Sequence, residues 1–248
     1  MKKLLLSLLA LPLLASGATI HLVGDSTMAN YSAKRAPLTG WGMALQKYCA
    51  DGVKVNNRAI SGTSSKSFRT PKNDNPKHKY WDNMIRRVKK GDFVVIQFGI
   101  NDASKDPARH AAAGSDFQTN LKAFISEVRA KGATPVLCTQ IVTCRVNKKG
   151  VVYNATKNKE YVAATLKVAK ETGCEVVDLN TPSLKHFNKI GAAEAEKLYM
   201  MGAAGKKDKN GNISIDRTHL NAAGADYYAV LFAEIAKAQN LSIGKLLK

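Results

Sequence analysis

The sequence predicts an α/β fold, a three-layer α/β/α sandwich built around a five-stranded parallel sheet, and three observations support this. Short apolar runs of strand length alternate with longer segments whose apolar residues recur at helical spacing. That alternation is typical of parallel strands joined by crossover helices. The chain has 248 residues and 45% hydrophobic content, enough for one domain with a full core. No Pro/Gly/Ser-rich linker divides it, so a single domain over residues 19–248 is expected.

The expected elements follow one another as strand and helix pairs. Each pair is an apolar run followed by a helical pattern, in the order 19–23 and 40–50, 53–60 and 80–89, 93–98 and 116–130, 134–141 and 155–171, 175–179 and 221–239. In such sheets, ligands bind at the carboxyl ends of the strands, where the connecting loops start. The residues that follow each strand are therefore the candidates for a functional site.

Residues 1–18 have the features of a secretory signal peptide. Lys2 and Lys3 precede an apolar run over residues 4–14, and small residues suited to cleavage follow it. The run is shorter than the roughly 20 residues that span a bilayer, and no later segment is apolar enough to span one. We expect the segment to be removed and the protein to be secreted or periplasmic.

The chain is strongly basic, with a formal net charge of +19. Loss of residues 1–18 leaves 36 basic and 19 acidic residues, a formal charge of +17. Such a charge favours anionic partners and speeds their encounter. For an exported protein we expect an acidic polysaccharide, an anionic lipid surface or a charged wall, and no nucleic acid. A basic surface that serves only solubility is the alternative.

Four cysteines, Cys49, Cys138, Cys144 and Cys174, would meet an oxidising compartment after export. Cys138 and Cys144 flank one expected loop and are the first candidate pair, although buried free thiols account for the strand residues Cys138 and Cys174 equally well. No cysteine or histidine spacing fits zinc. Residues 208–212 alternate oxygen-bearing side chains, but their glycine stands at the fourth place of the loop and not the sixth, so no metal is expected.

Three residues from two distant motifs can form a serine nucleophile. Ser26 lies in Gly-Asp-Ser-Thr directly after the first expected strand, and Asp216 precedes His219 by three residues just before the last expected helix. An alcohol needs a neighbouring base to attack a carbonyl, and a carboxylate on the other ring nitrogen fixes the tautomer of that base. Each motif alone is consistent with an ordinary turn or helix start. Their joint placement predicts a catalytic site.

Attack by Ser26 would also require donors for the negative charge that develops on the carbonyl oxygen. Gly62 follows the second expected strand and Asn101 the third, which places both on the edge that carries Ser26. The backbone N–H groups of Ser26 and Gly62 and the side-chain amide of Asn101 are the candidate oxyanion-hole donors.

These motifs resemble the four conserved blocks of the SGNH, or GDSL, hydrolases, over most of the chain after residue 18. The resemblance implies a flavodoxin-like sandwich with Ser26 as nucleophile, His219 as base and Asp216 as its partner. It also implies an oxyanion hole made by Ser26, Gly62 and Asn101. The segment 24–29, the Gly-Trp-Gly at 40–42 and the motif at 219–224 resemble the rhamnogalacturonan acetylesterases in particular, which implies deacetylation of pectic sugars.

One position departs from that subgroup. Its members often have His where this chain has Ile100. The candidate oxyanion donor Asn101 is retained, but the substrate subgroup is not decided by the sequence. Candidate substrate contacts are Trp41, which could stack on a sugar or belong to the core, and Arg69 and His78, from a basic stretch after the second strand that also holds Lys72, Lys77 and Lys79.

The sequence-based hypothesis is an exported carbohydrate O-acetylesterase that acts on an acidic acetylated polysaccharide as a monomer without a cofactor. A lipase, lysophospholipase or aryl esterase with the same catalytic residues is the alternative, which would need an apolar groove for its acyl chain. A non-catalytic polyanion-binding protein is the alternative from another class.

Overall fold

The computed structural model describes residues 17–248 except 71–74, 155 and 202–214. Residues 1–16 of the expected signal peptide, Lys72 and the rejected calcium loop at 208–212 lie outside the described residues. In the described part of the chain, no helix combines the length and apolarity that crossing a membrane requires.

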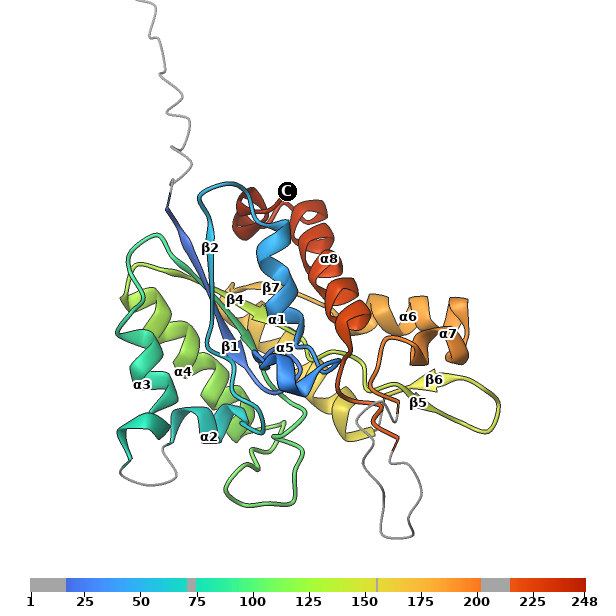
Figure 1. The fold of residues 1–248 in the computed structure, drawn as a ribbon. Coiled ribbons are helices and arrows are strands. Elements are labelled where there is room, and N and C mark those ends of the chain that lie inside the picture. The colour runs from blue at the N-terminus through green and yellow to red at the C-terminus, as the bar shows by residue number, and fades with distance from the viewer. Residues whose placement is uncertain (1–16, 71–74, 155, 202–214) are drawn as a thin grey trace, which may run out of the picture.

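A five-stranded parallel sheet lies at the centre of the molecule (Figure 1). Its strands are β1 (Thr19–Gly24), β2 (Lys54–Asn57), β3 (Phe93–Gln97), β4 (Thr134–Cys138) and β7 (Glu175–Val177). They are ordered β2-β1-β3-β4-β7, and every neighbouring pair is parallel. The expected fold class and all five strands are confirmed, although four of the strands end earlier than predicted.

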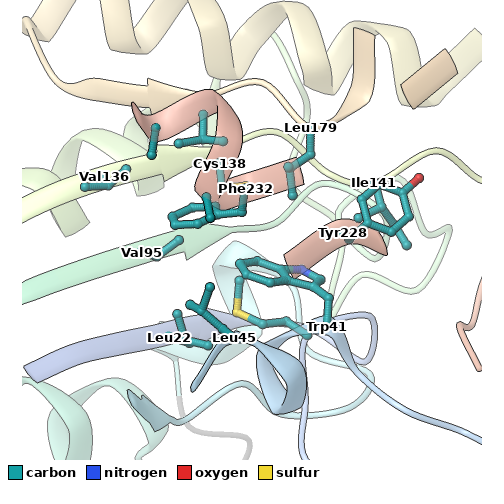
Figure 2. Close-up of a cluster of buried hydrophobic side chains, with 14 of the residues drawn as sticks. Leu22, Trp41, Leu45, Val95, Val136, Cys138, Ile141, Leu179, Tyr228 and Phe232 are labelled. Carbon is teal, nitrogen blue, oxygen red and sulfur yellow. The ribbon is translucent and has the colours of Figure 1, made fainter. Parts of the chain in front are cut away.

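Helices cover both faces of this sheet because successive strand residues point to opposite sides. Leu22 packs into a core under α1 (Trp41–Ala44), α6 (Asn180–Ile190), α7 (Ala192–Glu196) and α8 (Ala222–Ala238) (Figure 2). The adjacent Val23 packs into a second core under α2 (Ser65–Arg69), α3 (Tyr80–Ile85), α4 (Asp116–Ala130) and α5 (Thr156–Thr172). The two cores make the three layers.

Several elements differ from the sequence-based prediction. The helix expected over 40–50 is α1 followed by a 3-10 turn, Leu45–Tyr48, and the helix expected over 80–89 ends at Ile85. The prediction also missed α2, α6, α7 and a small antiparallel hairpin made of β5 (Arg145–Val146) and β6 (Val152–Tyr153). These elements are short or mostly polar, so their apolar periodicity is weak.

The strand order places the site. β1 lies between β2 and β3, so the loops that follow these three strands meet at one edge of the sheet. Chain order reverses between β1 and β3, and such a switch point opens a crevice at the carboxyl ends of the strands. Ser26, Gly62 and Asn101 follow β1, β2 and β3, respectively.

All four cysteines are buried free thiols in this structure. Cys138 and Cys144, the pair expected first, are not bonded to each other. The Cys138 thiol lies within hydrogen-bonding distance of the Gln97 amide and of the Thr139 carbonyl in the core. Burial raises the pKa of Cys144 to about 11, which keeps it a neutral thiol.

Candidate active site

A tight turn at the end of β1 presents Ser26. The N–H groups of Met28 and Ala29 both donate to the Asp25 carbonyl, at 3.2 and 3.1 Å. The Asp25 carboxylate accepts the backbone N–H of Thr27 at 2.9 Å and its hydroxyl at 2.8 Å. Asp25 is 1% exposed, and this burial raises its pKa. The turn is therefore fixed from beneath by a buried side chain.

Ser26, His219 and Asp216 form one hydrogen-bonded chain. His219 Nε2 lies 2.9 Å from Ser26 Oγ, and His219 Nδ1 lies 2.7 Å from Asp216 Oδ2. The serine and the histidine are 193 positions apart in the sequence. This is the geometry in which a histidine can take a proton from the hydroxyl while a carboxylate holds its other nitrogen.

The Asp216 carboxylate is held in its ionised form. Burial alone would raise its pKa, but hydrogen bonds from the His219 ring and from the backbone N–H groups of His219 and Thr218 outweigh that effect and lower it to about 2. An ionised carboxylate at this position stabilises an imidazolium on His219.

The loop that carries Gly62 is fastened to the end of β1. The Gly24 carbonyl accepts the N–H of Ile60 at 3.0 Å and the hydroxyl of Thr63 at 3.2 Å. Gly62 has a φ of +83°, a conformation that other residues rarely adopt, and a Cβ there would meet no atom within 4 Å. Among the described residues, the N–H groups of Ser26 and Gly62 donate to no other group. Both remain available to an oxyanion.

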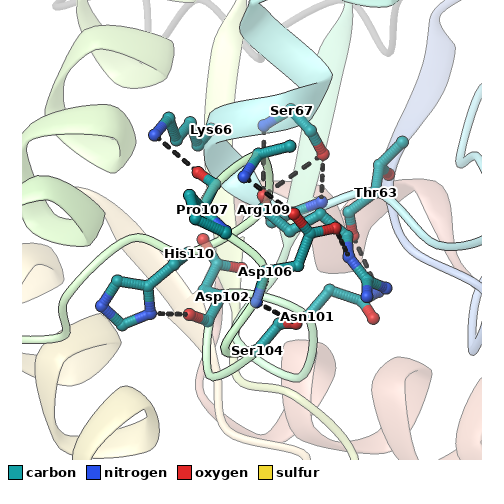
Figure 3. Close-up of polar contacts among 12 residues, drawn as sticks. Thr63, Lys66, Ser67, Asn101, Asp102, Ser104, Asp106, Pro107, Arg109 and His110 are labelled. Atoms are coloured by element: carbon teal, nitrogen blue, oxygen red, sulfur yellow. Dashed lines mark hydrogen bonds and ion pairs between the residues drawn. The ribbon is translucent and has the colours of Figure 1, made fainter. Parts of the chain in front are cut away.

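The loop after β3 is bonded to the Gly62 loop through Asn101 and Asp102 (Figure 3). The Asn101 amide donates to the Thr63 carbonyl at 2.8 Å. The fully buried Asp102 carboxylate accepts the backbone N–H of Ser65 and of Gly99, both at 3.0 Å, and the hydroxyl of Ser65. Burial raises the pKa of Asp102 to about 7. Asp102 thus fixes the two loops that carry the remaining candidate donors.

Tyr31 is a contact that the sequence-based reasoning missed. Its hydroxyl donates to the backbone carbonyl of Ser26 at 2.7 Å. The guanidinium of Arg35 lies over its ring, 5.6 Å from the centroid. No motif in the sequence distinguishes this tyrosine, because its role depends on where the loop 31–39 folds back.

Trp41 belongs to the core and offers no face to a sugar. It has no exposed surface, stacks on Phe232, and donates its indole N–H to Gln97 at 2.9 Å (Figure 2). The neighbouring Gly40 is required by close packing, since a Cβ there would lie 2.2 Å from the Ala29 carbonyl oxygen. The Gly-Trp-Gly segment therefore supports the nucleophile loop from behind, and substrate stacking by Trp41 is corrected.

Arg69 is also occupied within the protein. Its guanidinium pairs with Glu127 and lies 4.9 Å from the centroid of the Phe124 ring and 5.8 Å from that of Trp81. The structure gives it a packing role, which corrects the expectation of substrate contact. His78, in contrast, lines a pocket beside Gly62, so it remains a candidate.

His219 lines a basic cleft of about 790 Å³. Asp216 and His219 line it together with four cationic side chains, Lys34, Arg35, Arg145 and Arg217. Arg217 pairs with Glu196, whereas no ion pair with a described residue involves the other three. The cleft therefore favours a negatively charged ligand beside the candidate nucleophile.

Comparisons with known proteins identify a family and several relatives. The model of the GDSL-like lipase/acylhydrolase family matches residues 22–227. The chain is 31% identical over 230 residues to the uncharacterized esterase YxiM of Bacillus subtilis, covering 90% of this chain and 53% of that protein. It is 29% identical over 215 residues to the rhamnogalacturonan acetylesterase RhgT of the same organism, covering 87% of this chain and 88% of that protein.

A crystal structure of YxiM from Bacillus subtilis superposes with a TM-score of 0.72 at 30% identity, covering 91% of this chain. The chain spans 58% of that solved structure, so it matches about half the length of YxiM.

Proposed function

The chain belongs to the GDSL-like lipase/acylhydrolase family, and on that premise we propose that it is a serine ester hydrolase that removes acetyl groups from an acidic, pectin-like polysaccharide. The observation that carries the proposal is the hydrogen-bonded chain Ser26–His219–Asp216, whose histidine and aspartate line a basic cleft. Similarity to a rhamnogalacturonan acetylesterase supports the substrate class.

The reaction proceeds in two steps through an acyl-enzyme. His219 takes the proton of Ser26 as Oγ attacks the acetyl carbonyl, then returns it to the sugar oxygen as the ester bond breaks. A water molecule then gives a proton to His219 as it attacks the acetyl-serine, and His219 returns that proton to Ser26 Oγ as the acyl bond breaks and acetate leaves. The N–H groups of Ser26 and Gly62 and the amide of Asn101 receive the oxyanion in both steps, each donor typically worth ~3 kcal/mol.

The lining of the cleft favours a small acyl group on a charged polymer over a long acyl chain. A lipase needs a continuous apolar groove. Here the apolar side chains Leu38, Met200 and Ile215 are interspersed with cations. Export, which depends on residues 1–18, is part of the proposal and would give the enzyme access to such polymers.

The test compares acetate release from acetylated pectin by the wild type and by Ser26→Ala. We expect the variant to lose activity by about four orders of magnitude or more, since the nucleophile is removed. Ser115→Ala, at an exposed position whose side chain makes no capping bond, is the matched control and should keep full activity. Substantial acetate release by Ser26→Ala would overturn the assignment, and equal rates on long acyl esters would favour the lipase alternative.

A further inference from the structure

A second basic groove lies beyond the catalytic cleft. It measures about 440 Å³ and is bordered by Arg58, Lys77 and Arg87. Its apolar side chains are Ile60, Pro76 and Met84, together with the ring of Tyr80. None of its described lining residues is acidic. An apolar surface with an aromatic ring, bordered by cations, suits a sugar ring that carries a carboxylate.

The three bordering cations are available to a ligand. Arg58, Lys77 and Arg87 are exposed, and none of them forms an ion pair with a described residue. Other exposed cations do pair with acids, as Lys122 does with Glu171 and Lys47 with Asp226. Among the described residues, no acid therefore neutralises the charge of the groove.

A middle pocket, whose lining includes Gly62 and His78, joins this groove to the catalytic cleft. Ile60 and Tyr80 line both the groove and the middle pocket, and Ser61 lines both the middle pocket and the catalytic cleft. Gly62 lies in the middle pocket, directly after these two loop residues. One continuous path therefore runs over the loop 60–62, past the candidate oxyanion donor.

The middle pocket carries less net positive charge than the cleft and the groove on either side of it. In the middle pocket, Arg109 pairs with Asp106, and Lys66 donates to the Pro107 carbonyl (Figure 3). The cleft on one side and the groove on the other retain cations that have no ion pair with the described residues. This pattern fits a polymer with carboxylates on both sides of a neutral acetylated unit.

We propose that the groove between Arg58, Lys77 and Arg87 is a distal binding site for the carboxylate-bearing polysaccharide chain that is deacetylated at Ser26. This inference rests on the proposed function, because it assumes that this polymer is the substrate. The groove holds the chain beyond the middle pocket and takes no part in bond breaking.

The first measurement is binding of fully deacetylated polygalacturonate to full-length Ser26→Ala protein at low salt. Adding Arg58→Gln, Lys77→Gln and Arg87→Gln should weaken binding about tenfold or more, because each exposed charge contact contributes a few-fold in affinity. The control adds Lys131→Gln, Lys185→Gln and Lys189→Gln, which remove the same charge from exposed positions away from the three pockets. This control variant should weaken polygalacturonate binding less than about twofold, because charges far from the bound chain are screened by salt.

The second measurement is kinetic and uses the groove variant with Ser26 intact. KM for long acetylated pectic chains should rise about tenfold with kcat unchanged, whereas kinetics on a small neutral acetyl ester and on acetylated disaccharides should not change. Equal effects of the groove and control variants, equal effects on short and long substrates, or equally tight binding of polyglutamate would each overturn the distal site. If polygalacturonate binds through the groove but no acetate is released from any pectic ester, the proposed function fails and the binding site stands.

Discussion

Two aspartates near the site, Asp216 and Asp102, carry the same side chain in opposite electrostatic states. Asp216 is one-third exposed, faces the His219 ring, and has a pKa lowered to about 2. Asp102 is fully buried, accepts hydrogen bonds from neutral donors only, and has a pKa raised to about 7. The difference shows that a carboxylate stays ionised where it faces a group that becomes cationic, and is destabilised as an anion where its main task is to hold loops.

The largest expected effect on activity comes from removing the ionised carboxylate of Asp216. Asp216→Asn should lower kcat by about 10³- to 10⁴-fold, because the amide no longer fixes the histidine tautomer or stabilises an imidazolium. Steady-state kinetics on an acetyl ester measures this at a temperature where the variant is folded, because loss of the ionised carboxylate also lowers its stability above pH 3.8. A loss of less than tenfold would contradict the role given to Asp216.

Replacing the second aspartate, Asp102, should lower mainly the free energy of unfolding. Asp102→Asn replaces one of the two acceptor oxygens with an N–H₂ group, so either the donors of Ser65 or the N–H of Gly99 lose their acceptor, at a cost of about 2–3 kcal/mol. Chemical denaturation measures the free energy of unfolding, and Asp116→Asn, at an exposed position, is the control. A variant as stable as the wild type would show that Asp102 does not hold the two loops.

The two aspartates should also give opposite pH dependences of stability. The folded pKa of Asp102 is raised from 3.8 to about 7, so its contribution is fully present below pH 3.8 and is lost as the pH rises toward 7. The folded pKa of Asp216 is lowered from 3.8 to about 2, so its contribution is present above pH 3.8 and is lost as the pH falls toward 2.

Unfolding free energies of wild type, Asp102→Asn and Asp216→Asn, measured over this pH range, separate the two contributions. The difference in unfolding free energy between wild type and Asp102→Asn should shrink as the pH rises from 4 to 7, because the folded pKa of Asp102 is raised. The difference between wild type and Asp216→Asn should stay constant over that range, because the pKa of Asp216 lies below it. Parallel curves for the two variants would refute the contrast.

The smallest expected effect comes from Tyr31, which touches the nucleophile only through its backbone. Tyr31→Phe removes one hydrogen bond to the Ser26 carbonyl, worth about 1 kcal/mol, so kcat should fall about three- to tenfold with KM little changed. The phenyl ring keeps its place under Arg35 in this variant. An unchanged kcat would mean that the turn alone positions Ser26.

Much of the site could be predicted because its chemistry lies in short motifs beside predictable elements. Ser26 follows an apolar strand, and Asp216 and His219 precede a strongly apolar helix, so the α/β topology brings them to one edge. Tyr31 and Arg35 could not be predicted, since they lie in a loop without periodicity and its path depends on tertiary contacts. Trp41 shows the converse limit, because an aromatic residue near a nucleophile has the same sequence pattern in a core as in a binding cleft.

The fold shows the same division. α4 agrees with its predicted bounds at both ends because its apolar stripe is strong. α6 was missed because Pro182 lies in its first turn and polar residues dominate its sequence, and it forms by packing Phe187 into the core. Tertiary burial, which no local pattern records, decides such segments.

The central claim is that Ser26, activated by His219, forms the acyl-enzyme, and mass spectrometry of peptides from protein quenched in the first turnover on an acetyl ester tests it most directly. The account predicts an acetyl group on the peptide that contains Ser26, much slower acetylation in His219→Asn and none in Ser26→Ala. Acetylation of another residue during turnover, or turnover by Ser26→Ala at the wild-type rate, would contradict it.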